Sequence, residues 1–272
     1  MKKAVTLIMA LAMVFALCAC GSGEQAAPAD SDKLVMGTSA DYAPFEFMYP
    51  DENGDMVFGG IDVFTADYVA ENMGKELQVE NMGFDYLLPS LQKGDYDIVI
   101  AAMEETEDRL KSADFSDPYY TDYPPMILVK ADKAEKLAEL ADFEGLSVAA
   151  QTATTKEAIV KDELTGANLV SLQVVTDIVN QLVNDKIDAA VLDGSVALEY
   201  AESNPDLAVA AASDKLGAAS PYCIAVQKGD PKNLLPGINE AIAKMLDEGK
   251  IQEFIDKADE LSGVAVEVSA EG

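Results

Sequence analysis

The sequence predicts an α/β fold with open sheets covered by helices. Short apolar runs of strand length alternate with amphipathic patterns of helix length along most of the chain, and this alternation is typical of that class. Hydrophobic residues make up 49% of the 272 residues, which is enough to bury a large core. Two segments, 91–103 and 182–194, also repeat one another. We therefore expect two similar lobes, each with its own sheet.

The N-terminal segment differs from this pattern. Residues 1–19 combine two lysines, an apolar run and small residues, which predicts a signal peptide for export. The stretch LCAC at 17–20 resembles a bacterial lipobox, with Cys20 as the lipidated first residue; a structural cysteine is the alternative. Residues 20–32 lack apolar periodicity and predict a flexible tether. We therefore expect an extracytoplasmic domain held at the membrane by a lipid anchor.

Charge and residue types argue against several classes of function. Acidic residues outnumber basic ones by 49 to 19, so the surface repels phosphate backbones and nucleic-acid binding is not expected. Histidine is absent, and Cys223 is the single cysteine of the predicted folded part. The usual zinc and iron ligand sets, and Ser-His or Cys-His nucleophiles, therefore cannot be assembled. DENGDM at 51–56 imitates a calcium loop, but methionine replaces its glycine. We predict no metal and no cofactor.

The first series of elements follows the tether. Apolar runs bounded by turn residues predict strands, and apolar residues at helical spacing predict helices between them. In chain order these are strand 34–38, helix 62–73, strand 77–80, helix 86–93 and strand 98–102. The first helix is predicted to end at Gly74, because glycine favours helix C-termini. DENGD at 51–55 predicts a hairpin-type turn.

A second series begins near residue 126 and shows the same alternation. In chain order we predict strands and helices at 126–130 (strand), 147–150 (strand), 155–163 (helix), 169–175 (strand), 178–184 (helix), 189–192 (strand), 196–202 (helix) and 207–210 (strand). The chain then closes with a strand at 223–227, an amphipathic helix at 234–246 and a last short helix from Ile251.

The internal repeat predicts where a site would lie. The segment from Leu91 to Asp97 has the same length as that from Leu182 to Asp188, and each introduces a buried strand. Those strands end at Ala102 and Asp193, again at equal spacing. Ligands of open α/β sheets bind beyond the carboxyl ends of the strands. If the similarity is more than chance between two ordinary βαβ units, the two strand ends would line one cleft from opposite sides.

Seven motifs in order resemble one known family. They are GTSADYAPFEF (37–47), GGID (59–62), FDYLLPSLQKGDYDIVIAAM (84–103), TEDR (106–109), SADFSDPYY (112–120), TATT (152–155) and DAAVLD (188–193). Together they resemble the bacterial solute-binding proteins of polar amino-acid ABC importers, over about 33–258. The resemblance implies a type II periplasmic-binding fold of two lobes joined by two hinge strands.

The same resemblance implies domain boundaries. Lobe 1 would comprise 33–121 together with 222–272, which includes the C-terminal tail, and lobe 2 would comprise 122–221. The hinges would lie at 120–123 and 219–222.

The family resemblance assigns the head group of an amino-acid solute to two charged residues. Arg109, the sole arginine, would clamp the α-carboxylate, since a planar guanidinium matches a carboxylate bidentately. The alternative is a surface arginine paired with Glu105 or Asp108 at helical spacing. Asp193 would accept the α-ammonium, and an N-cap for the helix that follows is its compatible alternative.

Further candidates follow from the same resemblance. Thr154 and Thr155 would add donors to the carboxylate, with plain helix capping as the alternative. Tyr42, Phe45 and Phe84 resemble aromatic walls around the solute side chain, with core aromatics as the alternative. Four other residues complete the predicted ligand-binding set: Ala101, Ala102, Glu104 and Gln151.

The sequence departs from the family pattern at Glu104. Relatives usually carry a small hydroxylated run where this chain has Ala-Ala-Met-Glu at 101–104. Glu104 either points to solvent in a first helical turn, where the dipole favours it, or faces the cleft. In the cleft it would repel the carboxylate of an ordinary amino acid, and select a solute with an extra amine or no free carboxylate. The position that is acidic in receptors for basic side chains is Ser39 here, which argues against basic solutes.

These features predict an extracytoplasmic, lipid-anchored substrate-binding protein of an ABC importer. We expect a monomer that captures a small amino-acid-like solute by lobe closure and delivers it to a membrane permease. One alternative is an enzyme on the same fold, of the cyclohexadienyl dehydratase type, in which Glu104 would act as the acid or base. Another is a lipoprotein that senses the solute and has no transport role.

Overall fold

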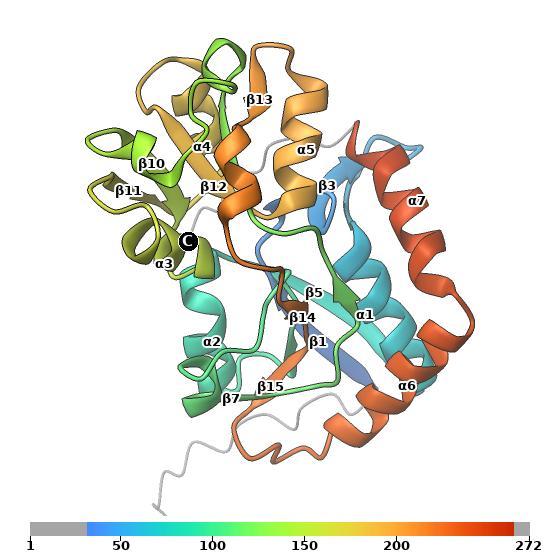
Figure 1. The fold of residues 1–272 in the computed structure, drawn as a ribbon. Coiled ribbons are helices and arrows are strands. Elements are labelled where there is room, and N and C mark those ends of the chain that lie inside the picture. The colour runs from blue at the N-terminus through green and yellow to red at the C-terminus, as the bar shows by residue number, and fades with distance from the viewer. Residues whose placement is uncertain (1–31, 264–272) are drawn as a thin grey trace, which may run out of the picture. The chain divides into compact units, whose positions relative to one another are not determined.

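The structure is a computed structural model that describes residues 32–263 (Figure 1). The predicted signal peptide, Cys20, nearly all of the predicted tether and residues 264–272 of the tail lie outside the described residues. Within the described part, the α/β fold class is confirmed. Two five-stranded mixed sheets are present, each with helices packed against it, and we use lobe 1 and lobe 2 for these two sheets with their helices.

The lobe 1 sheet has the strand order β5-β1-β6-β15-β7. Its strands are β5 (Glu76–Asn81), β1 (Lys33–Thr38), β6 (Ile98–Val99), β15 (Ala225–Gln227) and β7 (Ala113–Phe115). β1 lies parallel to β5 and β6, whereas β15 lies antiparallel to β6 and β7. A separate small sheet contains β2 (Asp41–Tyr42), β3 (Glu46–Pro50) and β4 (Met56–Gly59), and the β3–β4 hairpin confirms the turn predicted at 51–55.

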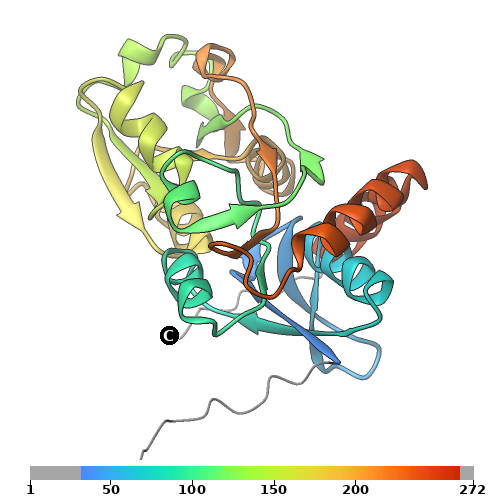
Figure 2. The same cartoon turned by 90° about the horizontal axis from the view of Figure 1, so that it is seen from below.

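Alternation along β1 places helices on both faces of the lobe 1 sheet. Leu34 and Met36 belong to the same buried cluster as residues of α1 (Ile61–Asn72) and α6 (Leu235–Asp247). Val35 packs instead against the cluster that contains Leu87 and Leu91 of α2 (Phe84–Lys93). Side chains alternate between the faces of a strand, so one strand serves both layers. The last helix, α7 (Lys250–Ser262), lies beside α1 and α6 in both views (Figures 1 and 2).

The lobe 2 sheet has the order β11-β10-β12-β9-β13. Its strands are β11 (Asn168–Leu172), β10 (Ser147–Gln151), β12 (Ala189–Leu192), β9 (Met126–Lys130) and β13 (Leu207–Val209). Val160 of α3 (Thr155–Asp162) packs on one face. On the other face lie α4 (Val175–Val183) and α5 (Gly194–Ser203). Short 3-10 helices complete the chain: η1 (Arg109–Lys111), η2 (Ala131–Lys133), η3 (Leu140–Phe143) and η4 (Ala211–Lys215).

The two sheets are built in the same way, as the repeat predicted. In each, a central strand lies parallel to two neighbours, and a strand from later or earlier in the chain then adds antiparallel. The repeated aspartates make the same contact: Asp97 accepts a 2.8 Å hydrogen bond from the Val35 backbone N, and Asp188 accepts one of 3.0 Å from the Ser147 backbone N. Each carboxylate therefore ties the turn before its strand to the neighbouring strand.

The chain passes between the two sheets through two short paired strands. β8 (Tyr120–Thr121) follows β7 and leads to β9, and β14 (Pro221–Tyr222) returns the chain to β15. β8 and β14 pair antiparallel, with Tyr120 opposite Tyr222. The carboxylate of Asp122, directly after β8, accepts a 3.1 Å hydrogen bond from the Ser195 backbone N at the start of α5. These are the segments in which the hinges are predicted.

Several predicted boundaries are wrong, for reasons that only the folded chain reveals. The strand predicted at 98–102 ends at Val99, because the backbone turns at Ala102 (φ 44°), whose N–H donates a 2.6 Å bond to Asp62. The helix predicted from 178 begins at Val175, where the Asp41 carboxylate accepts the backbone N–H at 2.8 Å. The final helix, which was predicted to be short, has 13 residues. Within the described residues, no helix is both long and apolar enough to cross a membrane.

Candidate functional site

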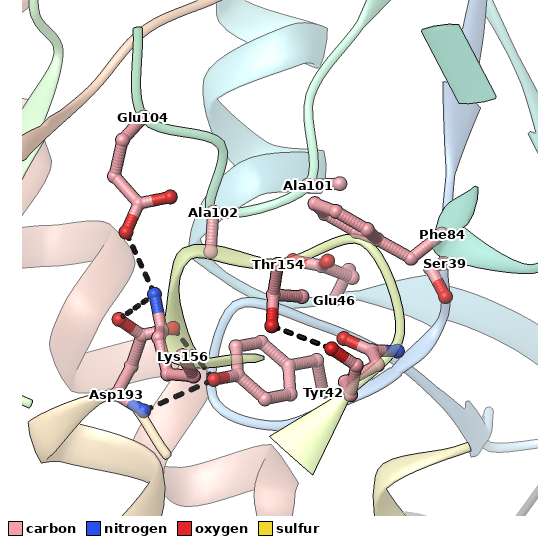
Figure 3. Close-up of a pocket in the computed structure, with 11 residues that line it drawn as sticks. Ser39, Tyr42, Glu46, Phe84, Ala101, Ala102, Glu104, Thr154, Lys156 and Asp193 are labelled. Carbon is pink, nitrogen blue, oxygen red and sulfur yellow. Dashed lines mark hydrogen bonds and ion pairs between the residues drawn. The ribbon is translucent and has the colours of Figure 1, made fainter. Parts of the chain in front are cut away.

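A small cavity lies where the ends of β6 and β12 approach each other. Its volume is about 10 Å³, which leaves room for a single water molecule at most. Residues of both lobes line it: Ser39, Tyr42, Glu46, Phe84, Ala101, Ala102, Glu104, Gln151, Thr154, Lys156 and Asp193 (Figure 3). Ala102 and Asp193, the two strand ends singled out by the repeat, both belong to this lining.

Eight of the eleven predicted ligand-binding residues line the cavity. They are Tyr42, Phe84, Ala101, Ala102, Glu104, Gln151, Thr154 and Asp193. Phe45 lies behind them in the core, with its ring 5.3 Å from that of Tyr222, which is the alternative weighed for it. Thr155 and Arg109 are outside the lining, but both contact Glu104.

Lys156 is a residue of the cavity lining that the sequence reasoning missed. Its ammonium lies between two carboxylates, with Nζ 2.7 Å from Oε1 of Glu104 and 2.5 Å from Oδ1 of Asp193 (Figure 3). Burial lowers the pKa of Lys156, but the charges of Asp193 and Glu104 outweigh it and raise the pKa above its ordinary value. The side chain is therefore a buried, charged group that bridges the lobes.

Glu104 faces the cleft, so the solvent-facing alternative is wrong. The residue is 6% exposed and lines the cavity. Besides Lys156, its carboxylate accepts a 2.8 Å bond from the Thr155 hydroxyl and a 3.2 Å bond from Arg109 Nη1. Burial raises the pKa of Glu104, but Lys156 and then Arg109 more than offset it and bring the pKa to about 2. Glu104 is therefore ionised at neutral pH.

The guanidinium of Arg109 is held by the groups around Glu104. Nη1 donates to the Glu104 backbone oxygen at 2.7 Å and to its carboxylate, and Nη2 donates to the Ala153 backbone oxygen at 3.4 Å. The guanidinium also lies 5.4 Å from the centre of the Phe84 ring, within cation–π range. Asp108, a partner considered from the sequence, pairs with Lys111 instead. Arg109 therefore binds a carboxylate of the protein itself, that of Glu104.

The Asp193 side chain accepts an ammonium but does not cap the helix that follows it. Asp193 is the N-cap residue of α5. Oδ2 accepts a 2.6 Å hydrogen bond from the Tyr42 hydroxyl, and Oδ1 contacts the Lys156 ammonium. Asp193 therefore already holds an ammonium.

The TATT segment divides its roles between neighbouring threonines. Thr154 is the N-cap of α3: its hydroxyl accepts from the Glu157 backbone N at 3.3 Å and donates to the Gln151 backbone oxygen at 2.6 Å. This is the capping alternative. Thr155 instead donates a 2.8 Å hydrogen bond to the Glu104 carboxylate of the other lobe. Of these two threonines, Thr155 alone donates a hydrogen bond to a carboxylate.

A second acidic group forms another part of the wall. Glu46, also missed from the sequence, is 1% exposed, and its Oε2 has no hydrogen-bond partner among the described residues. Asp62, its neighbour, accepts 2.6 Å bonds from the Tyr119 hydroxyl and the Ala102 backbone N. Burial and then the charge of Asp62 raise the pKa of Glu46 well above its ordinary value. Glu46 is therefore a buried acid of the cavity lining, and one of its oxygens is unpaired among the described residues.

The chain is similar to known binding proteins over nearly all of its length. The family model of bacterial extracellular solute-binding proteins, family 3, matches residues 34–267. The arginine-binding extracellular protein ArtP of Bacillus subtilis is 34% identical over 257 residues, covering 93% of this chain and 96% of ArtP. ABC transporter arginine-binding protein 1 of Escherichia coli is 31% identical over 229 residues, covering 84% and 90%.

A solved structure is also similar to this chain in both fold and sequence. The amino acid ABC transporter substrate-binding protein from Streptococcus pneumoniae, bound to L-arginine, matches with a TM-score of 0.79 and 36% identity, covering 87% of this chain and 96% of that one.

The two lobes around a shared cavity define a type II periplasmic binding protein, and this part of the fold prediction is confirmed. The chain belongs to the bacterial extracellular solute-binding proteins, family 3. Its relatives are named as amino-acid-binding proteins of ABC transporters. These names support solute binding outside the cytoplasm.

Proposed function

We propose that this protein is the substrate-binding component of an ABC importer, which captures an amino acid by closing its lobes and delivers it to a membrane permease. One observation carries the proposal: Arg109 and Asp193 come from different lobes, both are buried, and each contacts one member of the Glu104–Lys156 ion pair. A guanidinium and a carboxylate in this arrangement match the two ends of an amino-acid zwitterion.

The solute is an amino acid whose side chain carries N–H donors, arginine first. Its α-carboxylate binds Arg109 and Thr155, and its α-ammonium binds Asp193. The rings of Tyr42 and Phe84 flank the side chain, which runs toward the unsatisfied oxygen of Glu46. That oxygen supplies the acceptor expected at position 39 in receptors for basic side chains, where this chain has serine. The arginine-binding names of the relatives support this solute class.

The remaining predictions belong to the same proposal. Cys20 carries the lipid anchor, and the protein works as a monomer on the outer face of the cell membrane, or in the periplasm of an envelope with two membranes. The boundaries at 121/122 and 221/222 separate the lobes. Closure takes place about β8 and β14, whose pairing keeps the two crossings together. A solute shifts the lobes toward closure by binding the closed state preferentially.

Acid–base catalysis of the dehydratase type has little support from the geometry, because Lys156 and Arg109 both pair with the Glu104 carboxylate. It requires a carboxyl group that gains and loses a proton near neutral pH. The pKa of Glu104, about 2, keeps that residue ionised. A sensing role without transport would use the same solute site, and the genes beside this one would separate the two roles.

The test is a melting-temperature screen of the purified chain against the twenty amino acids and matched analogues. We expect L-arginine to raise the melting temperature, since a solute that binds only the folded state stabilises it. Agmatine, which keeps the guanidinium and lacks the carboxylate, is the matched control and should have a much smaller effect. If no amino acid in the panel stabilises the protein, the proposed function is wrong.

A further inference from the structure

Two side chains of the protein itself reproduce the charged groups of an amino acid inside the cleft. We propose that the Glu104 carboxylate and the Lys156 ammonium hold the positions meant for the carboxylate and ammonium of the solute, so that Lys156 is a tethered competitor that the solute must displace. This inference rests on the proposed function, and it identifies the residue that sets the affinity and the head-group specificity of the site.

The contacts of the pair are those expected of a bound zwitterion. Arg109 Nη1 and the Thr155 hydroxyl, the donors assigned to the solute carboxylate, lie 3.2 and 2.8 Å from the Glu104 carboxylate. Asp193, the acceptor assigned to the solute ammonium, lies 2.5 Å from Lys156 Nζ. The carboxylate and the ammonium are themselves 2.7 Å apart. In Figure 3, dashed lines join the Lys156 ammonium to the carboxylates of Glu104 and Asp193.

Lys156 Nζ contacts these two acids and donates a 3.1 Å hydrogen bond to the Thr155 hydroxyl, so the acids are the only charged groups in these contacts that compensate its charge. Lys156 is the second residue of α3, where the helix dipole disfavours a positive charge, and it is 5% exposed. A buried ammonium is tolerated only when carboxylates compensate for its lost hydration. An incoming ammonium can take over the bond to Asp193 while Lys156 returns toward water, so the exchange conserves the charge of the site.

A second cavity, which Lys156 also lines, can accommodate the Lys156 side chain after its displacement. It has a volume of about 210 Å³, and its wall includes Glu163 at the C-terminal end of α3. Glu104, Lys156 and Asp193 line both this cavity and the 10 Å³ one. The pair therefore forms the partition between a space too small for any amino acid and a space large enough for one. Rotation of Lys156 joins the two spaces.

This arrangement predicts which solutes gain entry. A solute without a charged α-ammonium cannot replace Lys156 on Asp193, so 2-hydroxy acids and N-acylated amino acids should be excluded even when their side chains fit. It also predicts that the lobes are bridged in the absence of solute, because Lys156 of lobe 2 binds Glu104, which lies in the segment between β6 and β7 of lobe 1.

The experiment compares the full-length wild-type protein with Lys156→Met, which keeps the length of the side chain and removes its charge. Lys161→Met is the matched control, since Lys161 lies on the same helix with 54% of its side chain exposed. The double variant Glu104→Gln/Lys156→Met keeps the net charge of the wild type and serves if the single variant does not fold. Small-angle scattering of solute-stripped protein reports lobe opening, and calorimetric titration with L-arginine reports affinity.

We expect both Lys156 variants to have a larger radius of gyration than the wild type without solute, and to bind L-arginine at least tenfold more tightly. Lys161→Met should match the wild type in both measurements. An unchanged radius, or affinity that is unchanged or weaker in the Lys156 variants, would overturn the inference, since Lys156 would then be inert or a direct contact of the solute. If no form binds any amino acid, the proposed function fails, whereas the scattering comparison still decides whether Lys156 bridges the lobes.

Discussion

The Tyr42 hydroxyl and the Asp193 carboxylate join the two lobes through a 2.6 Å hydrogen bond. The same hydroxyl accepts a 3.2 Å bond from the Asp193 backbone N, so it is both donor and acceptor. Tyr42 belongs to β2 and Asp193 follows β12, 151 positions further along the chain. Tyr42, which was predicted to flank the solute side chain, therefore also orients Asp193, which was predicted to bind the solute ammonium.

Replacing Tyr42 by phenylalanine removes this link and keeps the ring. We expect L-arginine to bind roughly tenfold or more weakly, because a hydrogen bond to a charged group contributes about 1.5 to 3 kcal/mol. Calorimetric titration measures the effect. Tyr86→Phe is the control, since Tyr86 is 55% exposed, and it should bind as the wild type does. Equal affinity in Tyr42→Phe and wild type would show that the hydroxyl does not position Asp193 for the solute.

Arg109→Lys tests whether the fork geometry matters beyond its charge. The guanidinium donates to three oxygens, on Glu104 and Ala153, and a lysine ammonium cannot reproduce that planar arrangement. We expect affinity for L-arginine to fall by more than tenfold and the free energy of unfolding to fall by about 1 to 3 kcal/mol. Titration and urea denaturation measure the two effects. Lys111→Arg, at an exposed neighbour, should change neither. An Arg109→Lys variant with wild-type affinity would refute the clamp.

The sequence could predict the framework because the framework is local. Strands and helices follow from apolar periodicity, and the matched spacings from Leu91 to Asp97 and from Leu182 to Asp188 reflect one βα unit used twice. The family motifs add the connection between the lobes. Boundaries failed where distant residues intervene: α4 begins early because Asp41, over 130 positions away, accepts the Val175 N–H.

The pair at the centre of the site was not predictable from residue types alone. Glu104 was recognised as a departure, but its orientation depends on Arg109 and Lys156, which neither spacing nor periodicity connects to it. Lys156 did carry a signal: a lysine in the first turn of a helix is unfavourable, so an acidic partner should exist. The identity of that partner required the fold. Glu46 was missed because it sits within an apolar strand motif, PFEF.

The buried acids predict an inverted response of stability to pH. Burial raises the pKa of Asp41 from 3.8 to about 6, against hydrogen bonds from Val175 and Ser39 that lower it, and burial likewise raises the pKa of Asp62 to about 6. The folded state thus binds these protons more tightly than the unfolded state does. Their contribution to stability is complete below about pH 4 and is lost as the pH rises through about 6.

We therefore expect the free energy of unfolding to increase when the pH falls from 7.5 to 5. The Asp41 share is roughly 1 to 1.5 kcal/mol, from about 1.4 kcal/mol for each pKa unit. Urea denaturation at both pH values measures it in wild type and in Asp41→Asn, which should lose that share. Glu52→Gln, which removes the same charge at an exposed position, should keep the wild-type difference. An Asp41→Asn difference equal to that of the wild type would contradict the assignment.

Gly60 holds the start of α1 against the strand that carries Glu46. Its φ of 114° is rarely adopted by other residues, and an added Cβ would lie 2.1 Å from the Phe45 backbone oxygen. That oxygen accepts a 2.9 Å bond from the Asp62 backbone N, so neither backbone segment can move without breaking the contact. Gly60→Ala should therefore lower the free energy of unfolding by about 3 kcal/mol or more, through overlap and backbone strain. Urea denaturation measures this loss.

Gly74→Ala separates overlap from backbone strain. Gly74 also has a positive φ, 67°, but its added Cβ would meet nothing within 4 Å. We expect Gly74→Ala to lower the free energy of unfolding by about 1 kcal/mol. Equal losses in the two variants would mean that the close approach of Gly60 to Phe45 contributes nothing.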